Sequence, residues 1–227
     1  MSLGTVVVTG GTGGLGVPVT THLLDVGWRV VVPARSPSGA LPEHPRLEQV
    51  RCDVGDPAQV ADVVAVAAND EGAPLTALVN LVGGFASGPR THEADPDILD
   101  RQLDLNVRTT YTMLRAVLPH LVAHGGGAIV STSSGAAVKP FPGGVAYSTA
   151  KAAVLALAES IAVEYKKDHI RSNALLPGVI DTPANRAAMP DSTRAGWVDP
   201  VDIAKVIAFL ISGDAIAISG AAIPLGL

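Results

Sequence analysis

The chain has 227 residues, of which 48% are apolar and 16% are charged, and its formal net charge is −5 at pH 7. This composition describes a compact globular protein and argues against disorder. A negative charge without any basic tract argues against a nucleic-acid partner. No uncharged apolar stretch reaches about 18 residues and no cationic leader precedes the first strand, so we expect a cytoplasmic protein without a membrane partner.

Short β-branched runs alternate with longer helical patterns along the chain. The predicted strands are 5–9, 29–32, 47–52, 77–82, 128–131 and 172–176. The predicted helices are 15–26, 57–69, 96–123, 146–167 and 200–212. Several strands are apolar without alternation, which is typical of strands covered on both faces. The pattern predicts an α/β fold in a single domain over residues 1–227, a doubly wound parallel sheet with helices on both faces.

Cysteine and histidine usage bears on compartment and metal binding. Cys52 is the only cysteine, so no internal disulfide can form, which fits a reducing compartment. We expect Cys52 to be a small buried thiol rather than a nucleophile. Of six histidines, only His120 and His124 are four residues apart, and no metalloprotease pattern surrounds them. We therefore predict no metal site.

Glycines are concentrated between the first predicted strand and the first predicted helix, in the segment VVVTGGTGGLG (6–16). Gly11, Gly13 and Gly16 fit the G-x-G-x-x-G fingerprint of Rossmann-type dinucleotide-binding proteins. A loop there must turn sharply, and a pyrophosphate can approach backbone N–H groups at the helix N-terminus. A glycine-rich turn alone is a weak signal, but its place between strand and helix favours a nucleotide.

Tyr147 and Lys151 form a Y-x-x-x-K motif within a predicted helix. Residues four apart lie on one helical face, so the phenol and the ammonium can serve one site. A nearby cation favours phenolate and brings a tyrosine pKa of about 10 closer to the operating pH. Ser134 stands thirteen residues before Tyr147, at the end of the predicted strand AIVSTSS (128–134).

These features together resemble the short-chain dehydrogenase/reductase family. The glycine segment also fits the family's T-G-x-x-x-G-x-G spacing from Thr9, and Ser134, Tyr147, Lys151 and Asn106 match its four catalytic positions. The resemblance implies that Tyr147 is the general acid and base, that Lys151 lowers its pKa and holds the nicotinamide ribose, that Ser134 binds the substrate oxygen, and that Asn106 organises the lysine and a water. CDVGD (52–56), LPGVIDT (176–182) and AISGAAIPLGL (217–227) extend the likeness through the chain.

The resemblance also implies a set of cofactor contacts at the predicted strand ends, including both members of the Y-x-x-x-K pair. The further members are Gly10, Thr12, Gly13, Gly14, Leu15 and Gly16 in the loop, Asp53 and Val54 beside the adenine, Asn80 and Gly83 after the fourth strand, and Pro177, Gly178, Val179, Ile180 and Thr182 beside the nicotinamide.

The sequence departs from the family after the fourth strand, where Asn80-Leu-Val-Gly83 replaces Asn-Asn-Ala-Gly. Because this segment lies beside the cofactor, a catalytically impaired nucleotide-binding or sensor relative remains an alternative. An epimerase or dehydratase on the same fold is another. A short substrate lid is expected around 183–198, and Phe141, Met189 and Trp197 are candidate pocket walls.

The second strand ends in VVVPARS, so that Ala34 and Arg35 stand where NAD-preferring relatives carry an acidic residue. A guanidinium can pair with a 2′-phosphate in a bidentate way, whereas a carboxylate would repel it. Arg35 therefore predicts a preference for NADP(H), with NAD(H) as the alternative cofactor.

The combined prediction is an NADP(H)-dependent oxidoreductase that interconverts a carbonyl and a hydroxyl group of a small molecule by hydride transfer. The helix AYSTAKAAVLALAESIAVEY (146–165) is apolar on more than one face, and its alanines permit close approach of another helix. It must be buried on two sides, which together with the resemblance predicts a homodimer or homotetramer.

Overall fold

The computed structural model describes residues 3–36, 38–189 and 194–226. Seven strands form one sheet in the order β3-β2-β1-β4-β5-β6-β7, and every neighbouring pair is parallel. This confirms the predicted doubly wound, Rossmann-type sheet. The strands are β1 (Thr5–Thr9), β2 (Arg29–Ala34), β3 (Leu47–Arg51), β4 (Leu75–Asn80), β5 (Gly127–Thr132), β6 (Ile170–Pro177) and β7 (Ala222–Leu225).

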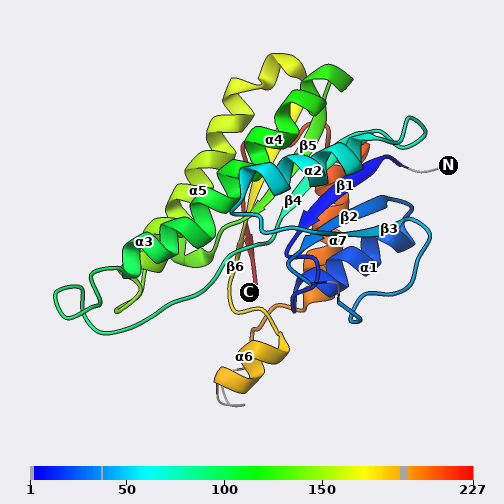
Figure 1. The fold of residues 1–227 in the computed structure, drawn as a ribbon. Helices are drawn as coiled ribbons and strands as arrows, with labels where there is room; N and C mark the ends of the chain where they lie inside the picture. Colours follow the sequence, from blue (N-terminus) through cyan, green and yellow to red (C-terminus); the bar gives the residue numbers. More distant parts are fainter. Residues whose placement is uncertain (1–2, 37, 190–193, 227) are drawn as a thin grey trace.

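Helices cover both faces of this sheet (Figure 1). Along β1, Val6 and Val8 belong to the core under α1 and α7, whereas Val7 belongs to the core under α2, α4 and α5. A strand buried on both faces needs apolar residues at every position, which explains the runs without alternation. The helices are α1 (Gly16–Asp25), α2 (Pro57–Ala68), α3 (Ile98–Leu103), α4 (Thr109–His124), α5 (Val145–Glu164), α6 (Pro183–Ala188) and α7 (Pro200–Ile211).

The long helix predicted over 96–123 has an irregularity that the sequence pattern did not indicate. It begins as α3, widens into a π-helical turn over Asp104–Arg108, and continues as α4. Single π-turns inside α-helices are frequent at functional sites. The turn carries Asn106, one of the four predicted catalytic residues.

The strand order changes direction between β1 and β4, since the chain builds outward to β2 and β3 first and then to β4 through β7. In open α/β sheets, ligands bind beyond the carboxyl ends of the strands at such a switch point. The fold therefore places the glycine loop, which follows β1, and the residues after β4, β5 and β6 around one region.

By length and composition, α5 is a helix of the described chain that could cross a membrane. In the structure it packs against the sheet, where Ala158 joins Ala174 and Leu176 in a buried cluster. A core helix of a globular protein passes the same test, so α5 is weak evidence for a membrane span.

Candidate active site

A cavity of about 490 Å³ lies at the carboxyl ends of the central strands. Ser134, Tyr147 and Lys151 all line it. Gly83, Leu15 and the four residues from Pro177 to Ile180 line it too. These residues come from five separate parts of the chain and meet at one cavity, as the topology leads one to expect.

Ser134 and Tyr147 lie close together in this cavity. Ser134 follows β5 in an extended conformation, and its Oγ accepts a hydrogen bond from the Ala136 N–H at 3.2 Å. Tyr147 is in the first turn of α5, and its side chain is hydrogen-bonded to that of Ser134. Burial raises the pKa of Tyr147 by more than this hydrogen bond lowers it. The tyrosine is therefore a protonated donor at neutral pH.

Lys151 lies one helical turn beyond Tyr147 and is buried. Its Nζ donates to the Thr132 carbonyl oxygen at 3.0 Å and lies 6.0 Å from the centroid of the Tyr147 ring. Burial lowers the pKa of Lys151 to about 8, because desolvation penalises the ammonium. The net direction at Tyr147 is upward, because burial raises its pKa by more than the Ser134 hydrogen bond lowers it.

Asn106 is fully buried and holds the chain that follows β4. Its Oδ1 accepts from the Gly84 N–H at 3.1 Å, and its Nδ2 donates to the Gly84 carbonyl at 3.2 Å. Gly83 passes so close that a Cβ there would lie 2.6 Å from Asn106 Oδ1 and 2.9 Å from Lys151 Nζ. The glycine kept in the altered segment is thus the one that the catalytic side chains require.

The apolar pair in that segment, Leu81 and Val82, is held through its backbone. Both N–H groups donate to Thr9 Oγ1, at 3.1 and 3.3 Å, and the Leu81 side chain lines the cavity. Asn80 is buried, with its Nδ2 3.4 Å from Ser131 Oγ, while its Oδ1 has no partner among the described residues. The departure from the family therefore changes side chains and leaves an ordered path beside the cavity.

The glycine loop has the geometry that a pyrophosphate needs. Gly10 adopts a positive φ of 68°, and a Cβ at Gly16 would overlap the Gly10 carbonyl oxygen. The first turn of α1 receives no side-chain cap from Leu15. Val17 N–H already donates to the Gly13 carbonyl at 2.9 Å and Pro18 carries no N–H, so Gly16 supplies the N–H group that this turn offers to an anion. Gly13 and Gly14 are exposed; the Gly13 N–H donates to the Gly10 carbonyl at 3.0 Å, and the Gly14 backbone is accessible to a ligand. The residues present therefore fit a dinucleotide.

Other predicted cofactor residues lie at the same edge of the sheet. Arg35 directly follows β2, is exposed, and makes no hydrogen bond or ion pair with the described residues. Asp53 follows β3, and its carboxylate accepts from the Gly55 N–H at 3.0 Å. Thr182 caps α6, and its Cβ would lie 2.9 Å from a Cβ at Gly14. The start of α6 is thus packed against the glycine loop. Thr12 is part of this loop, and the half-buried Val54 lies just after β3.

Two of the three candidate pocket walls line the cavity, and the expected lid region is described in part. Phe141 and Met189 line the cavity, and Trp197 does not. The expected lid at 183–198 begins with the short helix α6, and residues 190–193 lie outside the described chain.

Phe85 was missed by the sequence reasoning, although an aromatic residue two positions after Gly83 was the available signal. Its ring stacks on Phe141, with centroids 5.9 Å apart, and meets Tyr147 edge-on at 5.1 Å.

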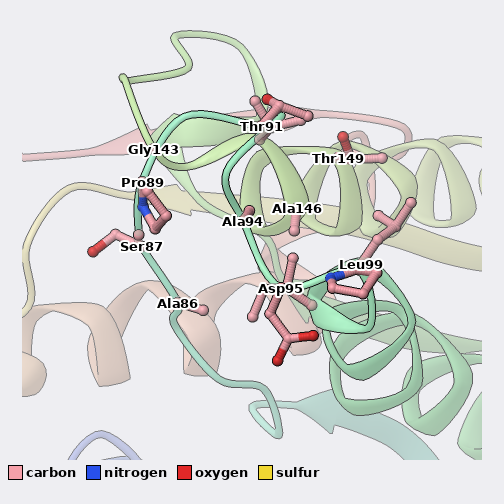
Figure 2. Close-up of a pocket in the computed structure, with 14 residues that line it drawn as sticks. Ala86, Ser87, Pro89, Thr91, Ala94, Asp95, Leu99, Gly143, Ala146 and Thr149 are labelled. Carbon is pink, nitrogen blue, oxygen red and sulfur yellow. The ribbon is translucent and has the colours of Figure 1, made fainter.

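A second cavity, of about 450 Å³, lies outside this site. Figure 2 shows the loop from Ala86 to Asp95 passing the first turns of α5, where Ala146 and Thr149 lie. The backbone of this loop is tied to the chain before α5 by a 3.0 Å hydrogen bond from the Gly88 N–H to the Gly143 carbonyl. None of the predicted catalytic or cofactor residues lines this cavity.

Cys52 is buried, as expected, and burial together with nearby carboxylates raises the pKa of its thiol to about 11. Such a thiol is not an activated nucleophile. Across the described ranges, no three His, Cys, Asp or Glu side chains are grouped as metal ligands would be.

Comparisons with known proteins match this chain to dehydrogenases. A family model described as short chain dehydrogenase matches residues 4–193. The chain is 33% identical to 2-(R)-hydroxypropyl-CoM dehydrogenase of Xanthobacter autotrophicus, over 96% of this chain and 94% of that protein. It is 30% identical to dehydrogenase/reductase SDR family member 4 of Homo sapiens, over 96% and 84%.

Solved structures agree. ElxO with NADP bound has a TM-score of 0.89 at 26% identity, covering 99% of this chain and 97% of that one. A 3-ketoacyl-(acyl-carrier-protein) reductase from Brucella melitensis complexed with NADH has the same TM-score, the same sequence identity and the same coverage of both chains. The family match, the sheet order and the site geometry agree, and the chain belongs to the short-chain dehydrogenase/reductase family.

Proposed function

We propose that the protein is an NADP(H)-dependent oxidoreductase that interconverts a carbonyl and a hydroxyl group of a small-molecule substrate. The observation that carries this proposal is the meeting of Ser134, Tyr147 and Lys151 in one cavity that also reaches the end of the glycine loop at Leu15. When bound, the nicotinamide supplies the hydride for reduction or accepts it in oxidation. The chain itself has to hold the substrate oxygen and move one proton.

The proton donor for reduction is the Tyr147 hydroxyl. Burial keeps its pKa above the ordinary value, so it carries a proton at neutral pH. Ser134 is hydrogen-bonded to it, and a substrate oxygen placed between the two hydroxyls would receive both bonds. In oxidation the same tyrosine, as phenolate, would take the proton back.

Lys151 and Asn106 position this pair. The Lys151 ammonium, 6.0 Å from the centroid of the Tyr147 ring, would stabilise the phenolate left after proton donation, and would also reach the ribose of a bound nicotinamide nucleotide. Asn106 fixes Gly84 by two hydrogen bonds, which keeps the backbone at Gly83 against Lys151 Nζ. The lysine is thereby held near both the tyrosine and the cofactor site.

NADP(H) is the proposed cofactor and NAD(H) the alternative. Arg35 is exposed after β2 with no described partner, which suits a guanidinium that waits for a 2′-phosphate. No carboxylate stands at Ala34 or Arg35 to hold a ribose diol. Among the structural neighbours, ElxO binds NADP, a tyrosine-to-phenylalanine variant of ElxO binds NADPH, and the Brucella melitensis reductase binds NADH.

The test of the proposal is Tyr147→Phe, assayed for NADPH oxidation against a panel of ketones, aldehydes and quinones. We expect turnover to fall by about a hundredfold or more, the usual contribution of a positioned general acid, while NADPH binding stays intact. Near-normal turnover would refute the assignment of the tyrosine. Binding without turnover in the native protein would instead favour a cofactor sensor, and product without net cofactor oxidation would favour an epimerase or dehydratase.

A homodimer or homotetramer is part of the proposal, together with a cytoplasmic location and a single domain over 1–227. The outer faces of α4 and α5 carry exposed apolar side chains, with Tyr111 55% and Val163 78% accessible. Between these helices runs a groove lined by Leu118, Val122 and Tyr165 among others. A second copy of the chain would cover this surface and supply the second burial that the apolar composition of α5 requires.

A further inference from the structure

Phe85 is an exposed aromatic side chain inside the catalytic cavity. It lies two residues after Gly83, and 60% of its surface is accessible. Of the three phenylalanines in the chain, Phe141 is half-buried in the same cavity and Phe209 is on α7, away from it. Neither the cofactor contacts nor the proton path described above uses Phe85.

The ring of Phe85 is held in place by the site itself. It stacks on Phe141 with an interplanar angle of 21°, and it meets Tyr147 at 70°. Phe141 is in turn fixed against the start of α5, since a Cβ at Gly144 would lie 2.5 Å from its ring. A ring ordered before binding loses little conformational entropy when a ligand covers it. Phe85 is therefore a prepared contact surface beside the proton donor.

The rest of the cavity wall sets what can lie on this surface. Met189 and Phe141 add further apolar area, and the polar side chains besides the catalytic groups are Thr132, Ser133, Lys139 and Asn185. A substrate with many hydroxyl groups would lose water at these apolar walls without recovering its hydrogen bonds. A flat apolar group would gain an offset or edge contact with the aromatic rings.

We propose that the substrate is a planar, conjugated carbonyl compound, such as an aryl ketone, an aryl aldehyde or a quinone, whose ring packs against Phe85 while its oxygen reaches Tyr147 and Ser134. This proposal rests on the proposed carbonyl chemistry. Phe85 acts as a positioning residue, since it orients the substrate and takes no part in the proton or hydride transfer.

The test compares acetophenone with cyclohexyl methyl ketone, which have the same number of heavy atoms. We would measure kcat and KM for both with NADPH, in the native protein and in Phe85→Leu, Phe85→Tyr and Phe209→Leu. For each variant we take the ratio of kcat/KM for acetophenone to kcat/KM for cyclohexyl methyl ketone. Comparing this ratio between variants removes the difference in intrinsic reactivity between the two ketones. We expect Phe85→Leu to reduce this ratio about fivefold, mainly through KM for acetophenone, because leucine keeps the apolar bulk and removes the ring. Phe85→Tyr should preserve the ratio, as should Phe209→Leu, which removes an exposed ring far from the cavity.

An unchanged ratio in Phe85→Leu would overturn the inference. This includes the case in which kcat/KM falls equally for both ketones and Phe85→Tyr does not restore it. Calorimetric titration of each ketone into the protein saturated with NADP⁺ gives a readout that needs no turnover. If neither ketone is reduced but acetophenone binds more tightly and Phe85→Leu abolishes the difference, the carbonyl chemistry fails and the aromatic site stands. Equal binding of the two ketones, or no binding of acetophenone, would refute the aromatic site itself.

Discussion

The charge of Lys151 is set by its burial, and this has a measurable consequence for pH dependence. Its pKa is lowered to about 8, while burial raises that of Tyr147 above its ordinary value. Below about pH 8 both groups are protonated, which suits reduction: the tyrosine can donate, and the ammonium can stabilise the phenolate that remains. Above this pH the lysine is neutral. We therefore expect kcat/KM for NADPH-dependent reduction to be level below about pH 8 and to fall above it.

Lys151→Arg is the control for this pH profile, because a guanidinium stays charged throughout the accessible range. In this variant the fall near pH 8 should disappear, whatever the absolute rate. A native profile that remains level to pH 10, or an arginine variant with the same inflection, would show that the lysine does not govern the rate.

Arg35 is the residue on which cofactor choice depends. Arg35→Asp replaces a cation that can pair with the 2′-phosphate by an anion that repels it, and charge-assisted hydrogen bonds of this kind support a loss of about tenfold or more in NADPH affinity. NADH affinity should hold or improve, since a carboxylate can accept from the ribose hydroxyls. Parallel fluorescence titrations with both nucleotides measure the ratio, and Arg90→Asp, an exposed arginine in the loop between β4 and α3 and outside the proposed cofactor contacts, is the matched charge control. An unchanged ratio in Arg35→Asp would contradict the assignment.

At the scale of elements, the chain between β4 and α3 forms one side of the catalytic site. Gly83→Ala would push a methyl group against Asn106 Oδ1 and Lys151 Nζ, so we expect about a hundredfold loss of turnover through displacement of the lysine. Gly88→Ala, in the same segment, meets no atom within 4 Å and should leave turnover unchanged.

Steady-state assays of both glycine variants, with thermal unfolding to check the fold, measure this effect. Equal activity of Gly83→Ala and the native protein would mean that the close approach seen at Gly83 has no part in catalysis.

The limits of sequence reasoning are also clearest at this scale. The strand–glycine–helix unit and the Y-x-x-x-K pair were predictable because both depend on local spacing. The glycines follow one another at fixed intervals in a single loop, and the tyrosine and lysine are four residues apart on one helical face. The π-turn at Asn106 and the ring cluster of Phe85 and Phe141 were not predictable, since each depends on contacts between segments distant in the chain. The raised pKa of Tyr147 escaped for the same reason, because burial is a property of the packed site.

For the whole molecule, the parallel sheet with helices on both faces followed from the alternation of apolar runs and helical patterns, because right-handed crossovers leave few topologies. The order of the strands was not predicted and comes from the structure. The surface through which copies of the chain would assemble did not follow. The proposed interface rests on the exposed apolar side chains of α4 and α5.

Val163→Lys tests the interface. A charge placed at this highly exposed position on α5 should dissociate the assembly without harming the core, because a lysine buried between two copies would have to lose its water. Light scattering after size-exclusion chromatography measures the mass, and Val26→Lys, exposed at the end of α1, is the control that should assemble normally. An unchanged mass for Val163→Lys, or a monomeric native protein, would contradict the proposed interface.

The most direct test of the central claim follows the transferred hydrogen. The protein would be incubated with NADPH deuterated at the nicotinamide C4 and a panel of conjugated ketones and aldehydes, whose alcohol products retain the transferred hydrogen on carbon, and the products analysed by mass spectrometry and NMR. The account predicts that deuterium appears on the carbinol carbon, from one face of the nicotinamide, and that Tyr147→Phe abolishes the transfer. No deuterium in any product, despite demonstrated NADPH binding, would contradict it.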